Sequence, residues 1–461
     1  MIPAAAIVLA AGQGTRMRSE IPKVLHPVCG VPMLEWVLRA LQFAGIQETL
    51  AVVGFGAQQV QSFLGEDFPT VLQSEQKGTG HAVMMATDWL KDQRGSVIVV
   101  AGDVPMILPS TLRSLVQRQA DTGAAVVMAT CHLPDPYGYG RIIRDSSGHV
   151  KGIVEHKDCS LEQLQNTEIN PAVYCFDAQA LLEALPRLSS DNAQGEYYLT
   201  DVIAMMADSP GGVEVVVSEE IDQFRGINDR WQLAEATQLV REGILRYHAT
   251  EGVTIIDPAS THIGPYVEIG QDTVVYPNTV LEGRTSIGRG CHVGPNTWIK
   301  HSTLGDRVRV FMSHVDQAEM RSGSRCGPFA NLRPQATLGE EVKIGNFVEI
   351  KNAEIGPSTS ISHLTYIGDA EVGASTNIGA GTITCNYDGF SKSKTSIGSN
   401  CFIGSNSTLV APVSIGDDAM VAAGSVVNKD VPDGALAIGR GRQENKEEWF
   451  RKWRDRKMSG V

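Results

Sequence analysis

Hydrophobic residues follow two different rhythms along this chain, and the first covers residues 1 to about 228. There, short runs of alanine and branched aliphatics alternate with amphipathic stretches. The apolar runs predict buried strands at Ala5–Leu9, Thr49–Val53, Val97–Val100 and Ala124–Met128. The amphipathic stretches Met33–Phe43 and Ser110–Gln119 each follow a proline and predict helices. This alternation predicts a mostly parallel, doubly wound (Rossmann-like) α/β sheet, with ligands at the carboxyl ends of its strands.

The second rhythm has a period of six. Its aliphatic positions are Ile263, Ile269, Val275, Leu281, Ile287, Val293 and Ile299, then Leu338, Ile344, Ile350, Ile355, Ile361, Ile367, Val372 and Ile378, and finally Ile397, Ile403, Leu409, Ile415, Val421 and Val427. Because a helix repeats near 3.6 residues and a strand near 2, a period of six predicts a left-handed parallel β-helix of hexapeptide repeats. Glycine often follows the aliphatic residue, and glycine and asparagine suit corners with left-handed backbone angles. The interruptions at about Leu304–Thr337 and Thr382–Thr395 are expected to leave the solenoid as loops.

These patterns divide the 461 residues into segments, since so long a chain exceeds one ordinary core. We expect an α/β domain at residues 1–228, a helical linker at 229–250, a β-helix domain at 251–436 and a tail at 437–461. The linker is predicted because Asp229–His248 has the pattern of one long helix.

Composition narrows the class of protein. A hydrophobic fraction of 42% and a charged fraction of 20% are typical of soluble globular proteins. No apolar stretch approaches the roughly 18 residues of a membrane span, and the first residues lack the charged leader of a signal peptide. The eight cysteines form no C-x-x-C pair, which favours reduced thiols in a cytoplasmic protein. The net charge of −13 argues against nucleic acid as the main partner.

A glycine-containing loop follows the first predicted strand. It reads Leu9-Ala10-Ala11-Gly12-Gln13-Gly14-Thr15-Arg16-Met17 and is followed by Pro22-Lys23. Small residues let backbone N–H groups approach a phosphate, and Arg16 and Lys23 add positive charge. The pattern matches neither a P-loop nor a dinucleotide fingerprint, so the loop alone leaves a phosphate site and an ordinary turn both open.

Further segments continue this pattern in order along the chain. They are Gln73, Gly78-Thr79-Gly80-His81-Ala82, Gly102-Asp103-Val104-Pro105, Gly138-Tyr139-Gly140-Arg141, Val154-Glu155-His156-Lys157-Asp158, Glu168-Ile169-Asn170, Glu196-Tyr197-Tyr198 and Gly226-Ile227-Asn228. Together with the loop they resemble the sugar-nucleotide pyrophosphorylases. With the hexapeptide region added, Ile7 to about Arg440 resembles the family of bifunctional enzymes that join a UDP-N-acetylglucosamine pyrophosphorylase to a glucosamine-1-phosphate N-acetyltransferase.

The resemblance implies a site for UTP in the first domain. The implied contacts of uracil and ribose are Leu9, Ala10, Ala11, Gly12, Gln73, Gly78 and Thr79, and those of N-acetylglucosamine are Gly140, Glu155 and Asn170. Asp103 and Asn228 would bind Mg²⁺, which prefers oxygen ligands, while Lys23 and Arg16 would stabilise the charge that develops at the phosphates. The alternative for Asp103 is a turn residue near a proline. Ala101 replaces a tyrosine of some relatives, so one nucleobase contact is expected to be missing.

The second domain contains His363 in Ile361-Ser362-His363-Leu364-Thr365-Tyr366, similar to the family's Gly-His-Leu-Thr-Tyr with Ser362 in place of glycine. An imidazole with a pKa near 6.5 suits a base that deprotonates an attacking amine, although a histidine can also merely decorate a coil. The resemblance implies glucosamine phosphate binding by Arg333, Lys351, Tyr366 and Asn377. It implies acetyl-CoA binding by Ala380, Asn386, Tyr387, Ser405, Ala423 and Arg440.

Two other features of this domain carry weaker hypotheses. Direct attack by the amine needs no acyl-enzyme, so Cys385 is not expected to act as a nucleophile. The scattered histidines His262, His292, His301 and His314 form no recognisable metal set. The basic stretch Arg440–Lys457 could pack on a neighbour, touch CoA phosphates or remain a solvated tail.

The sequence thus predicts a magnesium-dependent cytoplasmic enzyme that acetylates glucosamine-1-phosphate from acetyl-CoA and then transfers a uridylyl group from UTP to the product. The product would serve peptidoglycan and lipopolysaccharide synthesis. Because active sites in such β-helices lie between neighbouring prisms, a homotrimer is implied, with neither nucleic acid nor membrane insertion. The main alternative is a single-function pyrophosphorylase with a structural or regulatory β-helix. A non-enzymatic solenoid would leave Gly12–Lys23 and Asp103 unexplained.

Overall fold

The structure, a computed structural model, describes residues 4–460. Residues 1–3, part of the stretch for which no leader was expected, lie outside the described residues, as does residue 461. The chain forms two compact units, and the division falls between Arg241 and Glu242. Helix α8 (Arg230–Thr250) spans this division and covers most of the stretch predicted as one long helix. Within residues 4–460, no helix is long and apolar enough to cross a membrane.

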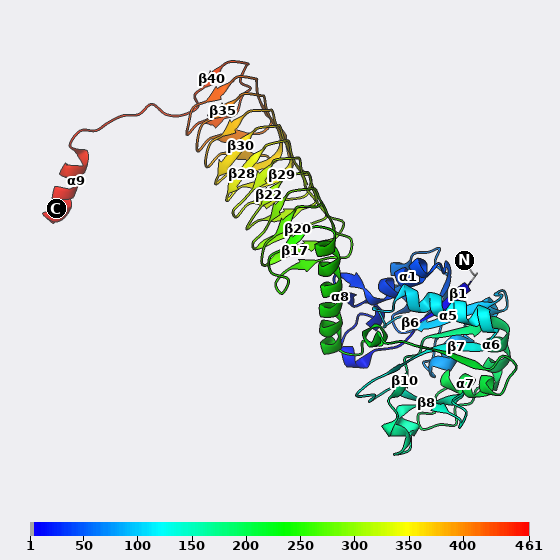
Figure 1. Cartoon of the computed structure of the whole chain (residues 1–461). Coiled ribbons are helices and arrows are strands. Elements are labelled where there is room, and N and C mark those ends of the chain that lie inside the picture. Colours follow the sequence, from blue (N-terminus) through cyan, green and yellow to red (C-terminus); the bar gives the residue numbers. More distant parts are fainter. Residues whose placement is uncertain (1–3, 461) are drawn as a thin grey trace. The chain divides into compact units, whose positions relative to one another are not determined.

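The first unit is built around one ten-stranded sheet (Figure 1). Its strand order is β5 (Thr70–Leu72), β4 (Glu48–Val53), β1 (Ala4–Ala10), β6 (Ser96–Ala101), β11 (Tyr174–Asp177), β7 (Val126–His132), β10 (Glu168–Asn170), β8 (Gly140–Arg144) and β9 (Val150–Val154), with β12 (Val213–Val217) beside β7. Strands β5, β4, β1 and β6 are parallel, as predicted. Strand β11 runs antiparallel to both its neighbours, and β8, β9 and β10 also pair antiparallel.

The prediction of a mostly parallel sheet is therefore wrong for the second half of the sheet. Parallel neighbours need long crossover connections, whereas a short loop joins β8 to β9 and favours their antiparallel pairing. Strand β10 lies between β7 and β8 and runs antiparallel to both. The strand predicted at Ala124–Met128 also begins later, at Val126.

Helices cover both faces of this sheet (Figure 1). Successive side chains of β1 point to opposite faces, so Ile7 joins one core and Val8 the other. Helices α1 (Met33–Ala44) and α5 (Pro109–Thr122) pack on the Val8 side, while α6 (Ala178–Ala184) and α7 (Thr200–Ala207) pack on the Ile7 side. The doubly wound α/β class is confirmed.

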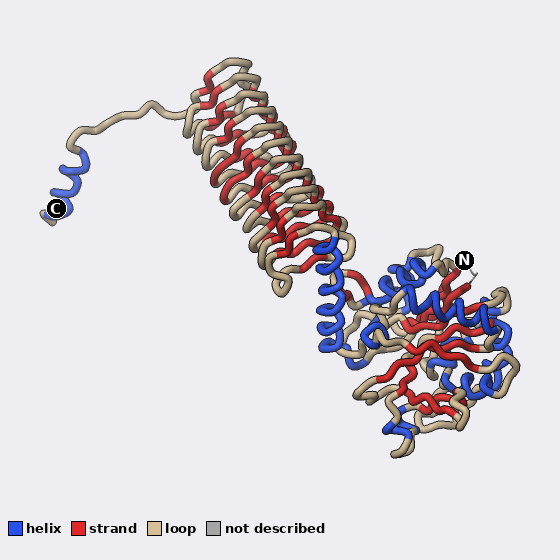
Figure 2. The backbone as a smooth tube through the Cα atoms, in the orientation of Figure 1, coloured by secondary structure: helices blue, strands red, loops and turns tan. Residues whose placement is uncertain are grey.

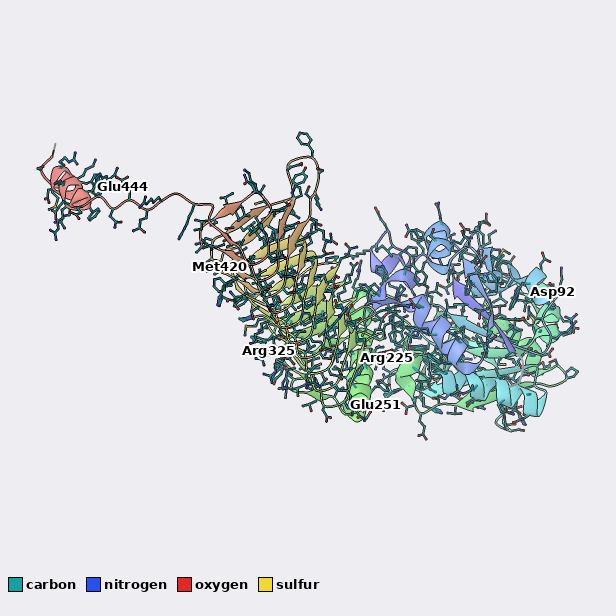
Figure 3. All side chains as sticks on the ribbon, turned by 90° about the horizontal axis from the view of Figure 1, so that it is seen from above. Asp92, Arg225, Glu251, Arg325, Met420 and Glu444 are labelled. Carbon is teal, nitrogen blue, oxygen red and sulfur yellow. The ribbon has the colours of Figure 1, made fainter. Side chains whose placement is uncertain are left out.

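The second unit is a parallel solenoid of short strands (Figure 2). One face carries eleven strands, from β13 (Thr254–Ile255) to β40 (Leu436–Ala437), and the other two faces form one sheet of seventeen. The predicted inward aliphatics are buried except Ile269, which is half-buried; Ile361 and Leu409 have 0% exposure. Figure 3 labels two residues of the outer surface, Arg325 and Met420, each the sequence neighbour of a buried residue. The predicted hexapeptide β-helix class is confirmed.

The first predicted loop of the solenoid, at Leu304–Thr337, is wrong. The coils continue there, with Val310, Val315, Met320, Cys326 and Leu332 buried at the inward positions. A strict count of six misses them because Val315 and Met320 stand five residues from the preceding inward residue. The second loop is real: after buried Thr384, residues 386–394 leave the register, which β34 (Thr395–Ile397) resumes. The tail contains α9 (Trp449–Met458), whose side chains are exposed.

Glycine in this unit allows neighbouring coils to approach closely more often than it forms the corners. Left-handed backbone angles at the corners are often taken by other residues, such as Asn352 and Leu364 with φ of 45° and 51°. Gly373 follows the inward Val372, and a Cβ added there would lie 2.5 Å from the backbone carbon of Gly398 in the next coil. Stacking of the coils therefore requires that residue 373 has no side chain.

Candidate active sites

The glycine-containing loop after β1 is anchored to neighbouring strand ends. The amide of Gly102 donates to the carbonyl of Leu9 (2.9 Å), and that of Phe55 donates to the carbonyl of Ala11 (3.1 Å). A Cβ added to Gly12 would meet no other atom within 4 Å. The loop therefore lies at the carboxyl ends of β1, β4 and β6, where open α/β sheets bind ligands.

Lys23 brings together the two residues predicted to bind a metal. Its Nζ donates to Asn228 Oδ1 at 2.8 Å and forms a close ion pair with Asp103 Oδ2. The amide of Ile227 donates to the carbonyl of Asp103 (3.0 Å), which fixes Asn228 beside the end of β6. Both oxygens thus converge on one cation, and the donor set fits Mg²⁺, which takes one or two protein oxygens and completes its shell with phosphates and water.

The residues predicted near the nucleobase also come together. Gln73 is buried, and its Nε2 donates to the carbonyl of Gly78 at 3.1 Å. Gly78 precedes α3 (Thr79–Met84), which places Thr79 at the start of that helix. Arg16, in the short helix η1 (Thr15–Met17), is exposed on the loop.

The three residues predicted to hold the sugar converge around Glu155. Asn170 pairs with Gly140 across β10 and β8, and a Cβ added to Gly140 would lie 3.6 Å from Glu155 Oε2. The hydroxyl of Thr200 donates to Glu155 Oε1 (3.1 Å), and burial raises the pKa of Glu155. This largely buried carboxyl can accept further hydrogen bonds, as a sugar hydroxyl or amide would supply.

In the second unit, His363 closes β30 (Ser360–His363) at an exposed position, and its Nδ1 lies 2.5 Å from Asn346 Oδ1. Asn346 ends β28 (Lys343–Asn346) and is the register partner of His363 in the preceding coil. Because an amide oxygen only accepts hydrogen bonds, Nδ1 carries the proton and Nε2 keeps its lone pair. This tautomer suits a general base that acts through Nε2.

Three residues predicted to bind acetyl-CoA continue the His363 position through later coils. Backbone amides of successive coils donate to the carbonyls of His363, Ala380 and Ser405 at 3.3, 2.7 and 2.8 Å, the last from the residue after Ala423. Ala380 is half-buried, while Ser405 and Ala423 are exposed. Ala380, Ser405 and Ala423 therefore form a column of small side chains that begins beside the imidazole of His363.

Charged and polar side chains gather on the adjoining face, beside β29 (Glu349–Ile355) and β31 (Tyr366–Val372). Arg333 Nη1 donates to Glu349 Oε1 at 2.7 Å. Asn386 Nδ2 contacts Asp369 and lies 3.5 Å from Tyr366 Oη.

Lys392, on the loop of residues 386–394, completes this group of cations. The neighbouring Lys351 ammonium lowers the pKa of Lys392, and two ammonium groups in contact favour a bound anion. The loop and the face beside it border an open cavity of about 460 Å³, which is lined by Lys392 and Lys394 and by the carboxylates of Glu354, Asp369 and Glu371.

Within one chain, these groups lie on neighbouring coils. His363 ends β30 three residues before Tyr366, Lys351 pairs with Gly368 of β31, and Asn377 pairs with Ser360 of β30. Tyr387 is exposed and donates to the carbonyl of Gly389 (2.6 Å), while Arg440 follows the last strand. Among residues 4–460, no three histidine, cysteine or acidic side chains gather as a metal site.

Comparison with known proteins assigns both units. The profile of MobA-like NTP transferase domains matches residues 6–206, that of the bacterial transferase hexapeptide matches 266–301, and that of the hexapeptide repeat of succinyl-transferase matches 394–429. The bifunctional protein GlmU of Geobacillus thermodenitrificans is 49% identical over 459 residues, which are 100% of each chain. The chain belongs to the bifunctional GlmU family. The chain is also similar to GlmU of Carboxydothermus hydrogenoformans, at 48% identity over 96% of this chain and 99% of the relative. Its identity to GlmU of Listeria monocytogenes is 46%, over 96% of each chain.

Membership in the GlmU family confirms the prediction of one enzyme with two activities, acetyl transfer to glucosamine-1-phosphate and uridylyl transfer to the product. A single-function pyrophosphorylase with a merely structural β-helix is not favoured.

Two residues beyond the predicted set join these sites: Asn346 and Lys392. The signal for Asn346 was its place 17 residues, one coil, before His363. No spacing in the sequence pointed to Lys392, because it lies on the loop outside the repeat.

Proposed function

We propose that uridylyl transfer takes place around Lys23, Asp103 and Asn228, and that acetyl transfer takes place at Nε2 of His363. The observation that carries the first assignment is the convergence of two oxygen ligands on the Lys23 ammonium. The second rests on the hydrogen bond of His363 Nδ1 to Asn346, which leaves Nε2 free to accept a proton.

Uridylyl transfer needs positioning and charge neutralisation more than a protein nucleophile. We place uracil and ribose at residues 9–12 with Gln73, Gly78 and Thr79, and the sugar at Gly140, Glu155 and Asn170. A phosphate oxygen of N-acetylglucosamine-1-phosphate attacks the α-phosphorus of UTP, the bond to the β-phosphate oxygen breaks, and pyrophosphate leaves. Lys23 and Arg16 stabilise the negative charge of the phosphates. Mg²⁺ held by Asp103 and Asn228 would neutralise further phosphate charge.

Acetyl transfer uses the column of Ala380, Ser405 and Ala423 and the cations Arg333 and Lys351 of the β-helix. The amine of glucosamine-1-phosphate attacks the thioester carbonyl of acetyl-CoA, Nε2 of His363 takes the amine proton, and the C–S bond breaks to release CoA. Arg333 and Lys351 bind the sugar phosphate, with Tyr366 and Asn377 as further contacts. Acetyl-CoA lies along Ala380, Ser405 and Ala423, and Asn386, Tyr387 and Arg440 complete its contacts. Cys385 takes no part.

A homotrimer completes this second site. His363 ends β30, whereas the cations lie beside β29 and β31, and we propose that a neighbouring copy brings further contacts to this site. We place the domains at residues 1–228, 229–250, 251–436 and 437–461. We also propose that the enzyme works in the cytoplasm, which its eight unpaired cysteines support.

Two single substitutions test whether the sites are separate. His363→Ala should abolish acetyl transfer, measured as CoA release with a thiol reagent, while pyrophosphate release from UTP stays at the wild-type rate. Asp103→Ala should do the reverse. Loss of both activities in each variant contradicts two sites. A dilution series that yields monomers with full acetyl transfer activity contradicts the trimer.

A further inference from the structure

Lys23 occupies the point at which the two proposed metal ligands converge. Its ammonium donates to Asn228 Oδ1 (2.8 Å) and forms the ion pair with Asp103 Oδ2. The side chains of Lys23 and Asp103 are only 13% and 20% exposed, so water screens this pair weakly. The ammonium therefore satisfies the same oxygens that the proposed function assigns to Mg²⁺.

These oxygens serve two cations at once only against the repulsion between the cations. Mg²⁺ binds oxygen at about 2.0–2.1 Å. An ammonium that kept its bonds to the same two oxygen atoms would therefore lie only a few ångströms from the metal ion. Their repulsion is large in a poorly hydrated site. The ion pair with Lys23 also cancels the negative charge of Asp103 that would attract a divalent cation. A metal should therefore bind more weakly while Lys23 stays paired with Asp103.

The glycine-containing loop passes close to the stem of Lys23. This flexible stem passes Gly14, whose φ is 60° and where an added Cβ would lie 2.7 Å from Lys23 Cβ. The space beside Gly12, on the same loop, is open. A triphosphate bound along this loop would present anionic oxygens to the ammonium, which a lysine can follow because its four-carbon stem rotates freely.

We propose that Lys23 is an internal counter-ion of the metal site: it excludes divalent cations until nucleotide phosphates draw it away, so that metal and nucleotide bind as one coupled event. The proposal rests on the metal site assigned above to Asp103 and Asn228. The coupling is reciprocal, so the metal strengthens nucleotide binding by the same factor as nucleotide strengthens metal binding.

Binding of Mn²⁺ to the full chain without nucleotide, followed by the electron paramagnetic resonance of free Mn²⁺, tests this role. Lys23→Met should bind Mn²⁺ at least about tenfold more tightly than wild type, in the usual range of coupling between sites. Lys23→Arg keeps the charge and should bind as weakly as wild type. Lys91→Met removes the lysine of an exposed ion pair with Asp88 and should change nothing. Adding Asp103→Asn to Lys23→Met should abolish the gain.

The possible outcomes separate this inference from the metal site on which it rests. If wild type and Lys23→Met bind Mn²⁺ equally tightly, and Asp103→Asn abolishes binding in both, the metal site stands and the role of Lys23 is refuted. If no variant shows binding that depends on Asp103, even with UTP present, the metal site itself is wrong. Because Lys23→Arg preserves the ion pair, tight binding by that variant would also refute the proposal.

Discussion

Asn346 holds the imidazole of His363 from one coil away, with 2.5 Å between Oδ1 and Nδ1. The two residues end paired strands, so the contact follows from the stacking of coils. Asn346 acts through His363 and is therefore a positioning residue.

Loss of this contact should impair acetyl transfer without touching uridylyl transfer. Asn346→Ala should lower kcat for acetyl transfer about tenfold, because the imidazole then loses its fixed tautomer and orientation. Asn346→Asp keeps an oxygen acceptor beside Nδ1–H and should restore most of kcat. Equal losses of kcat in Asn346→Ala and Asn346→Asp would show that Asn346 serves only packing.

Lys392 should contribute to phosphate binding. Lys392→Ala should raise KM for glucosamine-1-phosphate about tenfold with little change in kcat, because one charged hydrogen bond to the phosphate is lost. Lys394→Ala is the matched control: it lies on the same loop, is also exposed, and pairs with Glu371. Initial rates of CoA release give both constants. An equal rise of KM in the two variants would point to the loop's conformation instead of the charge.

Burial of Glu155 should make stability depend on pH. Burial raises its pKa above 4.5, so its favourable contribution is complete below the unfolded-state pKa and is lost as pH rises through the folded-state pKa. Glu155→Gln removes this loss. The free energy of unfolding of the variant, minus that of wild type, should therefore increase as pH rises from the unfolded-state pKa of Glu155 through its folded-state pKa. Urea unfolding at several pH values measures it. Glu183→Gln, at an exposed carboxylate, should give a flat difference.

Close packing of coils should make Gly373 intolerant of any side chain. Gly373→Ala should cost about 1–3 kcal/mol, because its Cβ would meet the backbone of Gly398 and Ser399. Thermal unfolding measures the loss. Gly441→Ala places a Cβ in open space and should leave the unfolding temperature unchanged. Equal unfolding temperatures for the two variants would mean that the coils can separate at no cost.

The interval Leu304–Thr337 shows where the sequence pattern stopped being informative. The period of six identified most inward positions, because each aliphatic must face the same narrow interior. It failed where sides shorten to five residues and where Met320 and Cys326 take the inward place. In the first unit, the strands of the parallel half were predictable from apolar runs. The direction of β11 was not, because it depends on how the chain returns through β8, β9 and β10.

The sequence by itself determined the two rhythms, hence both fold classes, and its motifs identified the family and the candidate residues. Only the tertiary structure decided which of them meet. Lys23 and Asn228 are 205 residues apart, and His363 and Asn346 are 17 apart. The physical reason is that a hydrophobic period reports which face of an element is buried, whereas contacts between polar side chains depend on strand order and coil register, which are set by packing of the whole unit.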